Sequence, residues 1–248
     1  MPADSSVSES RQGLASLVLG VDTCGPSGSV ALGRISGDCV QILNQEELAG
    51  RSYSANLVTA VKELLLEREA HLRDVRAIVA VRGPGSFTGV RVGLSTIKGL
   101  AEPGAIPVVA VSRLEVLAWK ADAPSSALDA HRQEIFLRVS EAGTQAREVL
   151  AGRTELSSIQ PPEGQLAVCD EGAATLLTSV WPEKTLLRAD APTAADAIQL
   201  AIGRILTRDF ADLALLDGHY LRRSDAEIFG EAGANASRHP GVDRCSQP

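Results

Sequence analysis

Aromatic residues are scarce in this 248-residue chain, where four Phe, two Tyr and two Trp make up 3% of the sequence. So few rings argue against an aromatic-lined pocket or a stacking platform for single-stranded nucleic acid. A surplus of basic residues is also lacking, since 24 Lys and Arg stand against 31 Asp and Glu and give a formal net charge of −7. We therefore expect the isolated chain to bind RNA poorly, because phosphate neutralisation supplies most of the non-specific affinity.

The cysteines are few and scattered, with no C-x-x-C spacing among Cys24, Cys39, Cys169 and Cys245. This pattern predicts reduced thiols in a cytoplasmic protein, and neither a disulfide framework nor a zinc site. Long hydrophobic runs are absent near the start, where the apolar stretch 17–21 ends at an acidic residue. We therefore expect no secretory signal and no membrane span.

The motifs of a self-sufficient hydrolase are missing too. None of the four histidines belongs to an H-x-x-x-H or H-E-x-x-H pattern, and no G-x-S-x-G elbow is present. Zinc-protease and serine-hydrolase chemistry need those residues at those spacings. We expect no catalytic residue and no metal ligand in this chain.

The composition is that of an ordinary globular protein, with 44% hydrophobic and 22% charged residues. A chain of this length can form two lobes around a substantial core. We expect an N-terminal lobe at 17–112 and a C-terminal lobe at 113–229, whose last helix, at about 192–210, packs back on the first lobe. The polar ends 1–16 and 230–248 are predicted to be disordered tails.

The spacing of apolar residues predicts the same order of elements twice, strand-strand-strand-helix-strand-helix-strand-helix. The first copy is expected at 17–21, 29–33, 40–46, 53–69, 77–81, 88–101, 106–111 and 114–120. The second is expected at 126–130, 135–140, 147–151, 155–160, 166–169, 173–180, 185–188 and from about 192, where Pro192 suits a first helical turn. A duplicated βββαβαβα order predicts an α/β protein with two similar lobes that meet at a cleft.

The segment Arg82-Gly-Pro-Gly-Ser-Phe-Thr-Gly89 joins a buried strand to a helix. Backbone N–H groups at such a helix start can bind an anion, which makes Gly83, Gly85 and Ser86 candidate phosphate-binding residues. A tight turn in which glycines adopt positive φ and Ser86 or Thr88 caps the helix explains the same residues equally well. The sequence leaves both interpretations open, although the spacing fits neither a P-loop nor a dinucleotide fingerprint.

A second candidate for nucleotide binding is the turn after the first strand. Asp22 and Thr23 end that strand, and Ser27 belongs to the hydroxyl-rich hairpin that follows. In two-lobed ATPases of this topology the hairpin wraps a phosphate and the acid holds a metal through water. The alternative is an Asx turn, in which Asp22 accepts hydrogen bonds from the N–H groups that follow it.

Two helices of the first lobe carry apolar or small residues at helical spacing. These residues either bury the helices against their own lobe or form a contact with another subunit. For the second interpretation we expect the interface residues to be Leu57, Val61, Leu65, Gly89, Val92, Gly93 and Ile97. A bulky change such as Gly93→Trp should then abolish pairing and leave the monomer folded.

Several of these segments resemble the TsaB (YeaZ) family. The resemblance rests on Val18-Leu-Gly-Val-Asp-Thr-Cys24, on Arg82-Gly-Pro-Gly-Ser-Phe-Thr-Gly-Val-Arg-Val-Gly93, and on Ile106-Pro-Val-Val-Ala-Val-Ser112. It also includes Tyr220-Leu-Arg-Arg-Ser-Asp-Ala-Glu-Ile228 near the end. The Gly-Pro-Gly-Ser-Phe-Thr-Gly block is the most specific of these matches.

The resemblance implies the actin-like, sugar-kinase-like ATPase fold (ASKHA) and a role in tRNA modification. Family members are non-catalytic partners of TsaD, which installs threonylcarbamoyl on N6 of adenosine 37 of ANN-decoding tRNAs, and TsaE joins the pair. It implies no cofactor of the chain's own, ATP or ADP with Mg at the level of the complex, tRNA contact only through the complex, and a homodimer as a further state. The alternative function is an ATP-dependent phosphotransferase or ATPase of the same fold; the glycoprotease label of the family lacks its metal ligands here.

Overall fold

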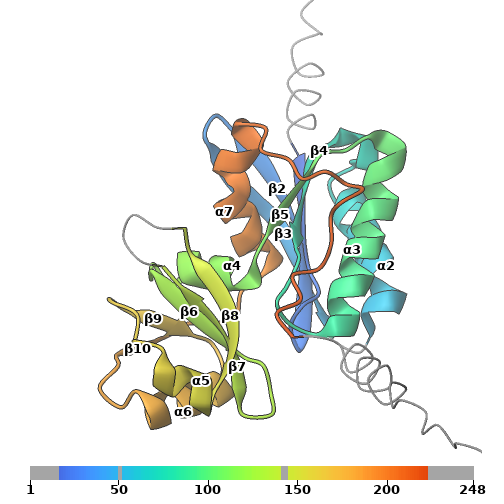
Figure 1. Cartoon of the computed structure of the whole chain (residues 1–248). Coiled ribbons are helices and arrows are strands. Elements are labelled where there is room, and N and C mark those ends of the chain that lie inside the picture. The colour runs from blue at the N-terminus through green and yellow to red at the C-terminus, as the bar shows by residue number, and fades with distance from the viewer. Residues whose placement is uncertain (1–16, 50–51, 141–144, 223–248) are drawn as a thin grey trace, which may run out of the picture.

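The computed structural model describes residues 17–49, 52–140 and 145–222. The predicted tails at 1–16 and 230–248 lie outside the described residues, as do 223–229 of the predicted second lobe. Two five-stranded sheets form the framework, one in each lobe (Figure 1). Each has antiparallel strands at one side and parallel strands at the other, so the duplicated α/β order is confirmed.

The first sheet has the strand order β3-β2-β1-β4-β5. Its strands are β1 (Leu17–Asp22), β2 (Ser27–Ser36), β3 (Cys39–Ala49), β4 (Val75–Val81) and β5 (Val108–Val111). The central β1 pairs antiparallel with β2 and parallel with β4. All six residues of β1 are buried, as expected for an apolar strand that is covered on both faces.

The second sheet repeats this topology in the order β10-β9-β6-β7-β8. Its strands are β6 (Ser125–Asp129), β7 (Glu134–Val139), β8 (Arg147–Gly152), β9 (Leu166–Val168) and β10 (Leu186–Arg188). Here β6 takes the central place of β1, with β7 antiparallel on one side and β9 parallel on the other.

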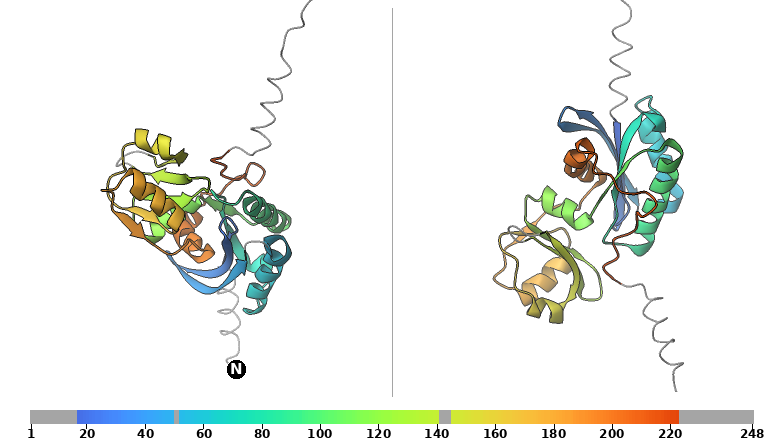
Figure 2. Two further views of the ribbon diagram at one scale, coloured as in Figure 1. Left: turned by 90° about the horizontal axis from the view of Figure 1, so that it is seen from below. Right: turned by 45° about the horizontal axis from the view of Figure 1, so that its top comes forward.

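The helices are α2 (Tyr53–Leu66), α3 (Phe87–Ala101), α4 (Arg113–Lys120), α5 (Arg153–Ser158), α6 (Glu171–Val180) and α7 (Ala194–Leu206), with short 3₁₀ turns η2 (Leu72–Asp74) and η3 (Glu102–Gly104). Helices α2 and α3 lie side by side on one face of the first sheet, and α7 covers the other face (Figures 1 and 2). Helix α4, which ends the first repeat, packs on β6, β7 and β9 of the second sheet. The two repeats have therefore exchanged their third helices.

The helix starts follow capping chemistry. Ser86 caps α3 as expected, since its hydroxyl accepts a hydrogen bond from Gly89 N. Helix α7 begins two residues after Pro192, because Thr193 and Asp196 form a capping box there. The hydroxyl of Ser52, which precedes α2, instead donates to Ala49 O, so the expected serine cap of that helix is wrong.

After α7 the chain forms an extended segment, residues 211–222, which we call the strap. Ala211 N donates to Val108 O (2.8 Å) at the edge of the first sheet, and His219 N donates to Arg82 O (2.7 Å). Figure 1 shows the strap, in red-orange, running along α3 toward the second lobe. The sequence analysis predicted no such segment.

Candidate functional site

Asp22, the residue at the end of β1, is fully engaged inside the protein. Its Oδ2 lies 3.2 Å from Nε of Arg113, the first residue of α4, and the two side chains are only 1% and 7% exposed. Its Oδ1 accepts a hydrogen bond from Cys24 N at 2.8 Å, which confirms the Asx turn. The expectation that Asp22 holds a hydrated metal is therefore corrected, because a buried carboxylate paired with arginine has no open face for water.

The surroundings of Asp22 are dry. Burial by itself would lower the pKa of Arg113, but the adjacent Asp22 carboxylate outweighs it, and the pKa of the guanidinium is raised. Burial, with Asp22 nearby, raises the pKa of Cys24 well above its usual value and the pKa of Tyr53 to about 12. The hydroxyl of Tyr53 donates to Gly25 O at 2.9 Å. These groups stay protonated at neutral pH and hold the turn closed.

The six candidate phosphate-binding residues do not share one accessible surface. Asp22, Thr23 and Gly83 are buried, whereas Ser27, Gly85 and Ser86 are exposed. Ser86 N is already used, since it donates to Cys24 O at 2.8 Å. The structure thus favours the tight-turn interpretation, in which Gly83 adopts a φ of 113° that suits glycine.

The glycines of α3 serve contact within the chain. A methyl group added at Gly89 would overlap Thr23 O, and one added at Gly93 would overlap Thr23 Oγ1. Thr23 Oγ1 also donates to Gly89 O at 2.7 Å. The expectation that Gly89 and Gly93 admit a partner's helix is corrected: they admit the end of β1.

The apolar interface residues are corrected for the same reason. Leu57, Val61, Leu65 and Ile97 all belong to the buried core of the first lobe, and Val92 is half-buried against it. Side chains inside the monomer cannot contact a partner without unfolding. Their helical spacing marks the inner face of α2 and α3.

The outer face of this two-helix layer carries different residues. Val58 and Leu66 of α2 are 56% and 60% exposed, although they are apolar, and they lie on one stripe with the exposed Lys62. On α3 the exposed positions include Phe87, Arg91 and the unobstructed Gly99. Within the described chain no element lies over this part of the layer (Figures 1 and 2).

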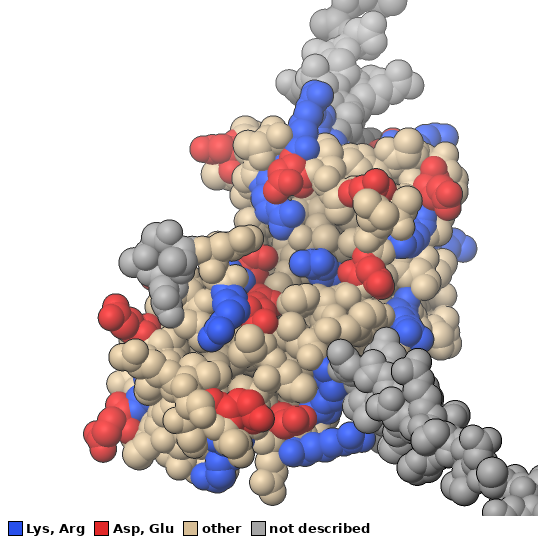
Figure 3. Space-filling model, viewed as in Figure 1, with Lys and Arg blue, Asp and Glu red and all other residues tan. Residues whose placement is uncertain are grey.

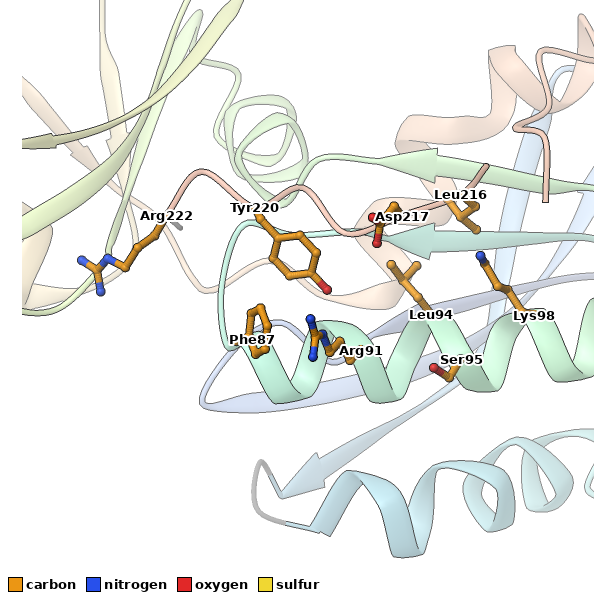
Figure 4. Close-up of a pocket in the computed structure, with 9 residues that line it drawn as sticks. All are labelled: Phe87, Arg91, Leu94, Ser95, Lys98, Leu216, Asp217, Tyr220 and Arg222. Atoms are coloured by element: carbon orange, nitrogen blue, oxygen red, sulfur yellow. The ribbon is translucent and has the colours of Figure 1, made fainter. Parts of the chain in front are cut away.

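A groove of about 440 Å³ separates α3 from the strap. It is lined by Phe87, Arg91, Leu94, Ser95, Lys98, Leu216, Asp217, Tyr220 and Arg222 (Figure 4). The rings of Phe87 and Tyr220 face each other with centroids 5.1 Å apart, and the Arg91 guanidinium lies 3.9 Å from the Phe87 centroid. Two of the eight aromatic residues therefore fasten the strap to the start of α3 by ring and cation–π contacts.

A buried carboxylate, Glu148 of β8, joins the two lobes. It accepts hydrogen bonds from Ser112 Oγ (2.7 Å) and Arg138 Nη1 (2.9 Å), and it lies 2.8 Å from Nε2 of His219. Burial would raise the pKa of Glu148, but these partners outweigh burial and lower the pKa. The order Ser112–Glu148–His219 places the acid between the other two groups, so it is not a nucleophile–base–acid relay. No sequence motif pointed to this cluster.

The surface and the titratable groups add three observations. The described residues hold no group of three or more His, Cys, Asp or Glu side chains placed to bind a metal ion. None of their helices is long and apolar enough to cross a membrane. On the face shown in Figure 3, acidic and basic side chains are interspersed.

Comparisons with known proteins agree on one family. The family model described as TsaD, tRNA N6-adenosine threonylcarbamoyltransferase, matches residues 41–167, just over half of the chain. The chain is 31% identical over 125 residues to the tRNA threonylcarbamoyladenosine biosynthesis protein TsaB of Escherichia coli, which is 48% of this chain and 52% of that protein. It is 34% identical over 125 residues to the same-named protein of Haemophilus influenzae, 48% of this chain and 51% of that protein.

The chain thus spans about half the length of the curated relatives it matches. The solved structure of YeaZ from Pseudomonas aeruginosa superposes with a TM-score of 0.67 at 26% identity, over 83% of this chain and all of that one. The resemblance seen in the sequence motifs is therefore confirmed by sequence and by structure, and the chain belongs to the TsaB (YeaZ) branch of the family that this TsaD model describes.

Proposed function

We propose that this chain is a non-catalytic subunit in threonylcarbamoyladenosine biosynthesis. In this proposal it pairs with a TsaD transferase, which places threonylcarbamoyl on N6 of adenosine 37 of ANN-decoding tRNAs. TsaE joins the pair, and tRNA is bound by the complex. The relatives named tRNA threonylcarbamoyladenosine biosynthesis protein support this role.

The observation that carries the pairing proposal is the outer face of α2 and α3. It presents Val58 and Leu66 to solvent on helices that are held rigidly from within. The rigid support comes from Leu57, Leu64 and Val61 in the core and from the glycine contacts of α3. Exposed apolar side chains on a preformed surface lose free energy on burial against a partner without a large ordering cost.

The pairing proposal is tested with the double variant Val58→Glu/Leu66→Glu. Two carboxylates in an apolar contact should be left without partners, and we expect affinity for TsaD of the same organism to fall at least about tenfold, roughly 1.4 kcal/mol. The measurement is calorimetric titration of the purified chain with TsaD. Because both positions are exposed, the variant should keep the thermal stability of the parent.

Leu206→Glu is the matched control, since Leu206 is 47% exposed at the end of α7, on the opposite face of the sheet. It should bind TsaD like the parent. Wild-type affinity in the folded double variant would remove α2 from the interface. Measuring the mass of each variant without TsaD shows whether the same face forms a homodimer.

We further propose that the chain binds no nucleotide alone and that ATP or ADP with Mg is bound at the level of the complex. The buried Asp22–Arg113 pair supports this, because it closes the turn that would receive a nucleotide. Titration of the isolated chain with Mg-ATP should give no binding heat. Measurable binding to the isolated chain would favour a phosphotransferase or ATPase instead.

A further inference from the structure

The strap is attached to both lobes. Its first half belongs to the first lobe, where Leu216 is buried in the core and Leu213 packs against it. The backbone of His219 is still held by this lobe, through the hydrogen bond to Arg82 O. Tyr220 then stacks on Phe87 of α3.

The end of the strap contacts the second lobe through three side chains. His219 Nε2 reaches Glu148 Oε2 at 2.8 Å, and Arg222 forms an ion pair with Glu134 of β7. Leu221 packs against the small apolar cluster that includes Leu114 and Phe136. His219 is thus the residue at which the strap changes lobes, with its backbone on one and its side chain on the other.

The lobe junction has another side that is built differently. There, the Asp22–Arg113 ion pair is almost fully buried, and Arg113 N donates to Gly83 O at 2.6 Å. The chain itself also crosses between the lobes at Ser112, before α4, and between β10 and α7. Covalent crossings and a buried pair cannot separate without large cost.

The strap contacts with the second lobe are more accessible. The side chains of His219 and Arg222 are 26% and 27% exposed, so water and salt reach both ion pairs. Leu221 is only partly buried. The weakest link between the lobes is therefore the end of the strap.

We propose that the strap is a clasp that fixes the angle between the lobes, and that the lobes pivot about the Asp22–Arg113 side when its end leaves the second lobe. In the released state the strap stays on the first lobe, because Leu216 and the Ala211 bridge hold it there. The bonds broken are those of His219, Leu221 and Arg222. Nothing in this inference depends on the identity of the partner subunit.

The test measures the distance between spin labels on the two lobes of the full chain. The labels are attached to cysteines that replace the exposed Lys62 of α2 and Thr175 of α6, with Cys39 and Cys245 changed to serine. Cys24 and Cys169 are retained, because burial raises the pKa of both thiols, for Cys169 to about 11. The triple variant His219→Ala/Leu221→Ala/Arg222→Ala is compared with the parent.

We expect one narrow distance distribution in the parent and a second, resolved population in the triple variant. Arg188→Ala is the control, since it removes an exposed ion pair with Glu171 inside the second lobe and should change nothing. The parent is also measured at low and high salt, which covers the case of a triple variant that does not fold. An inter-lobe distance that is the same in the folded triple variant, or unchanged by salt if that variant does not fold, would overturn the clasp.

Discussion

Single missing side chains determine how closely α3 approaches the end of β1. At Gly89 and Gly93 the backbone of α3 lies against Thr23, and any Cβ would overlap that residue. Glycine is conformationally costly inside a helix, so its presence at these positions indicates a close contact. Gly99, on the outer face, meets no atom within 4 Å of a built Cβ.

This contrast predicts opposite effects for the same substitution. Gly93→Ala should lower the free energy of unfolding by about 1–3 kcal/mol, because the added methyl group forces Thr23 or the helix to shift. Gly99→Ala should raise it by up to about 1 kcal/mol, because alanine favours the helix and the space is open. Urea unfolding of both variants measures the two effects. Equal stabilities would refute the packing role of Gly93.

It follows that Gly93→Trp would not report on partner binding, contrary to the expectation from the sequence. The substituted side chain would collide with Thr23 inside the lobe. Loss of pairing in that variant would come from loss of the fold.

Among the elements, α7 shows most clearly how an end signal and tertiary packing combine. Its apolar face, with Ala197, Ile198, Ala201 and Ile205, is buried against the first sheet, although the helix follows the second. Thr193 begins it: the hydroxyl accepts from Asp196 N and donates to Asp196 Oδ2 at 2.8 Å. Asp196 also pairs with Lys120 of α4 at 2.9 Å, which ties the two exchanged helices together.

Removal of this cap should destabilise the whole protein. Thr193→Ala is expected to cost about 1 kcal/mol of unfolding free energy, since an N-cap hydroxyl satisfies donors that otherwise lack a partner. Thr207→Ala, at the exposed C-terminal end of the same helix, should cost less than about 0.5 kcal/mol. Thermal denaturation of the pair distinguishes them, and a Thr193 variant as stable as the Thr207 variant would contradict the capping role.

For the whole molecule, periodicity was enough to predict the duplicated order, because strands such as Ala77–Val81 are continuously apolar and the helices alternate regularly. It could not show which face of α2 and α3 is outermost, since a buried stripe and an interface stripe have the same spacing. It also could not predict Asp22–Arg113 or Glu148–His219. These partners are 91 and 71 residues apart in the sequence, and only the folded topology joins them.

The Glu148 cluster makes the stability of the lobe junction depend on pH. Its partners lower the pKa of Glu148 below the ordinary 4.5, so its contribution to stability is present above that value and is lost as pH falls through the lowered pKa. Glu148→Gln should be less stable than the parent at neutral pH. The difference should shrink below pH 4.5. Denaturation of both proteins across that range measures it, and a gap that stays constant would exclude the charged cluster as its cause.

The central claim is that this chain activates a transferase and does not transfer the group itself. The most direct measurement is formation of threonylcarbamoyladenosine on an ANN-decoding tRNA, with threonylcarbamoyl-adenylate, TsaD and TsaE, in the presence and absence of this chain. The account predicts product only when TsaD and this chain are both present, and little product with Val58→Glu/Leu66→Glu. Full product formation without this chain, or product from this chain without TsaD, would contradict it.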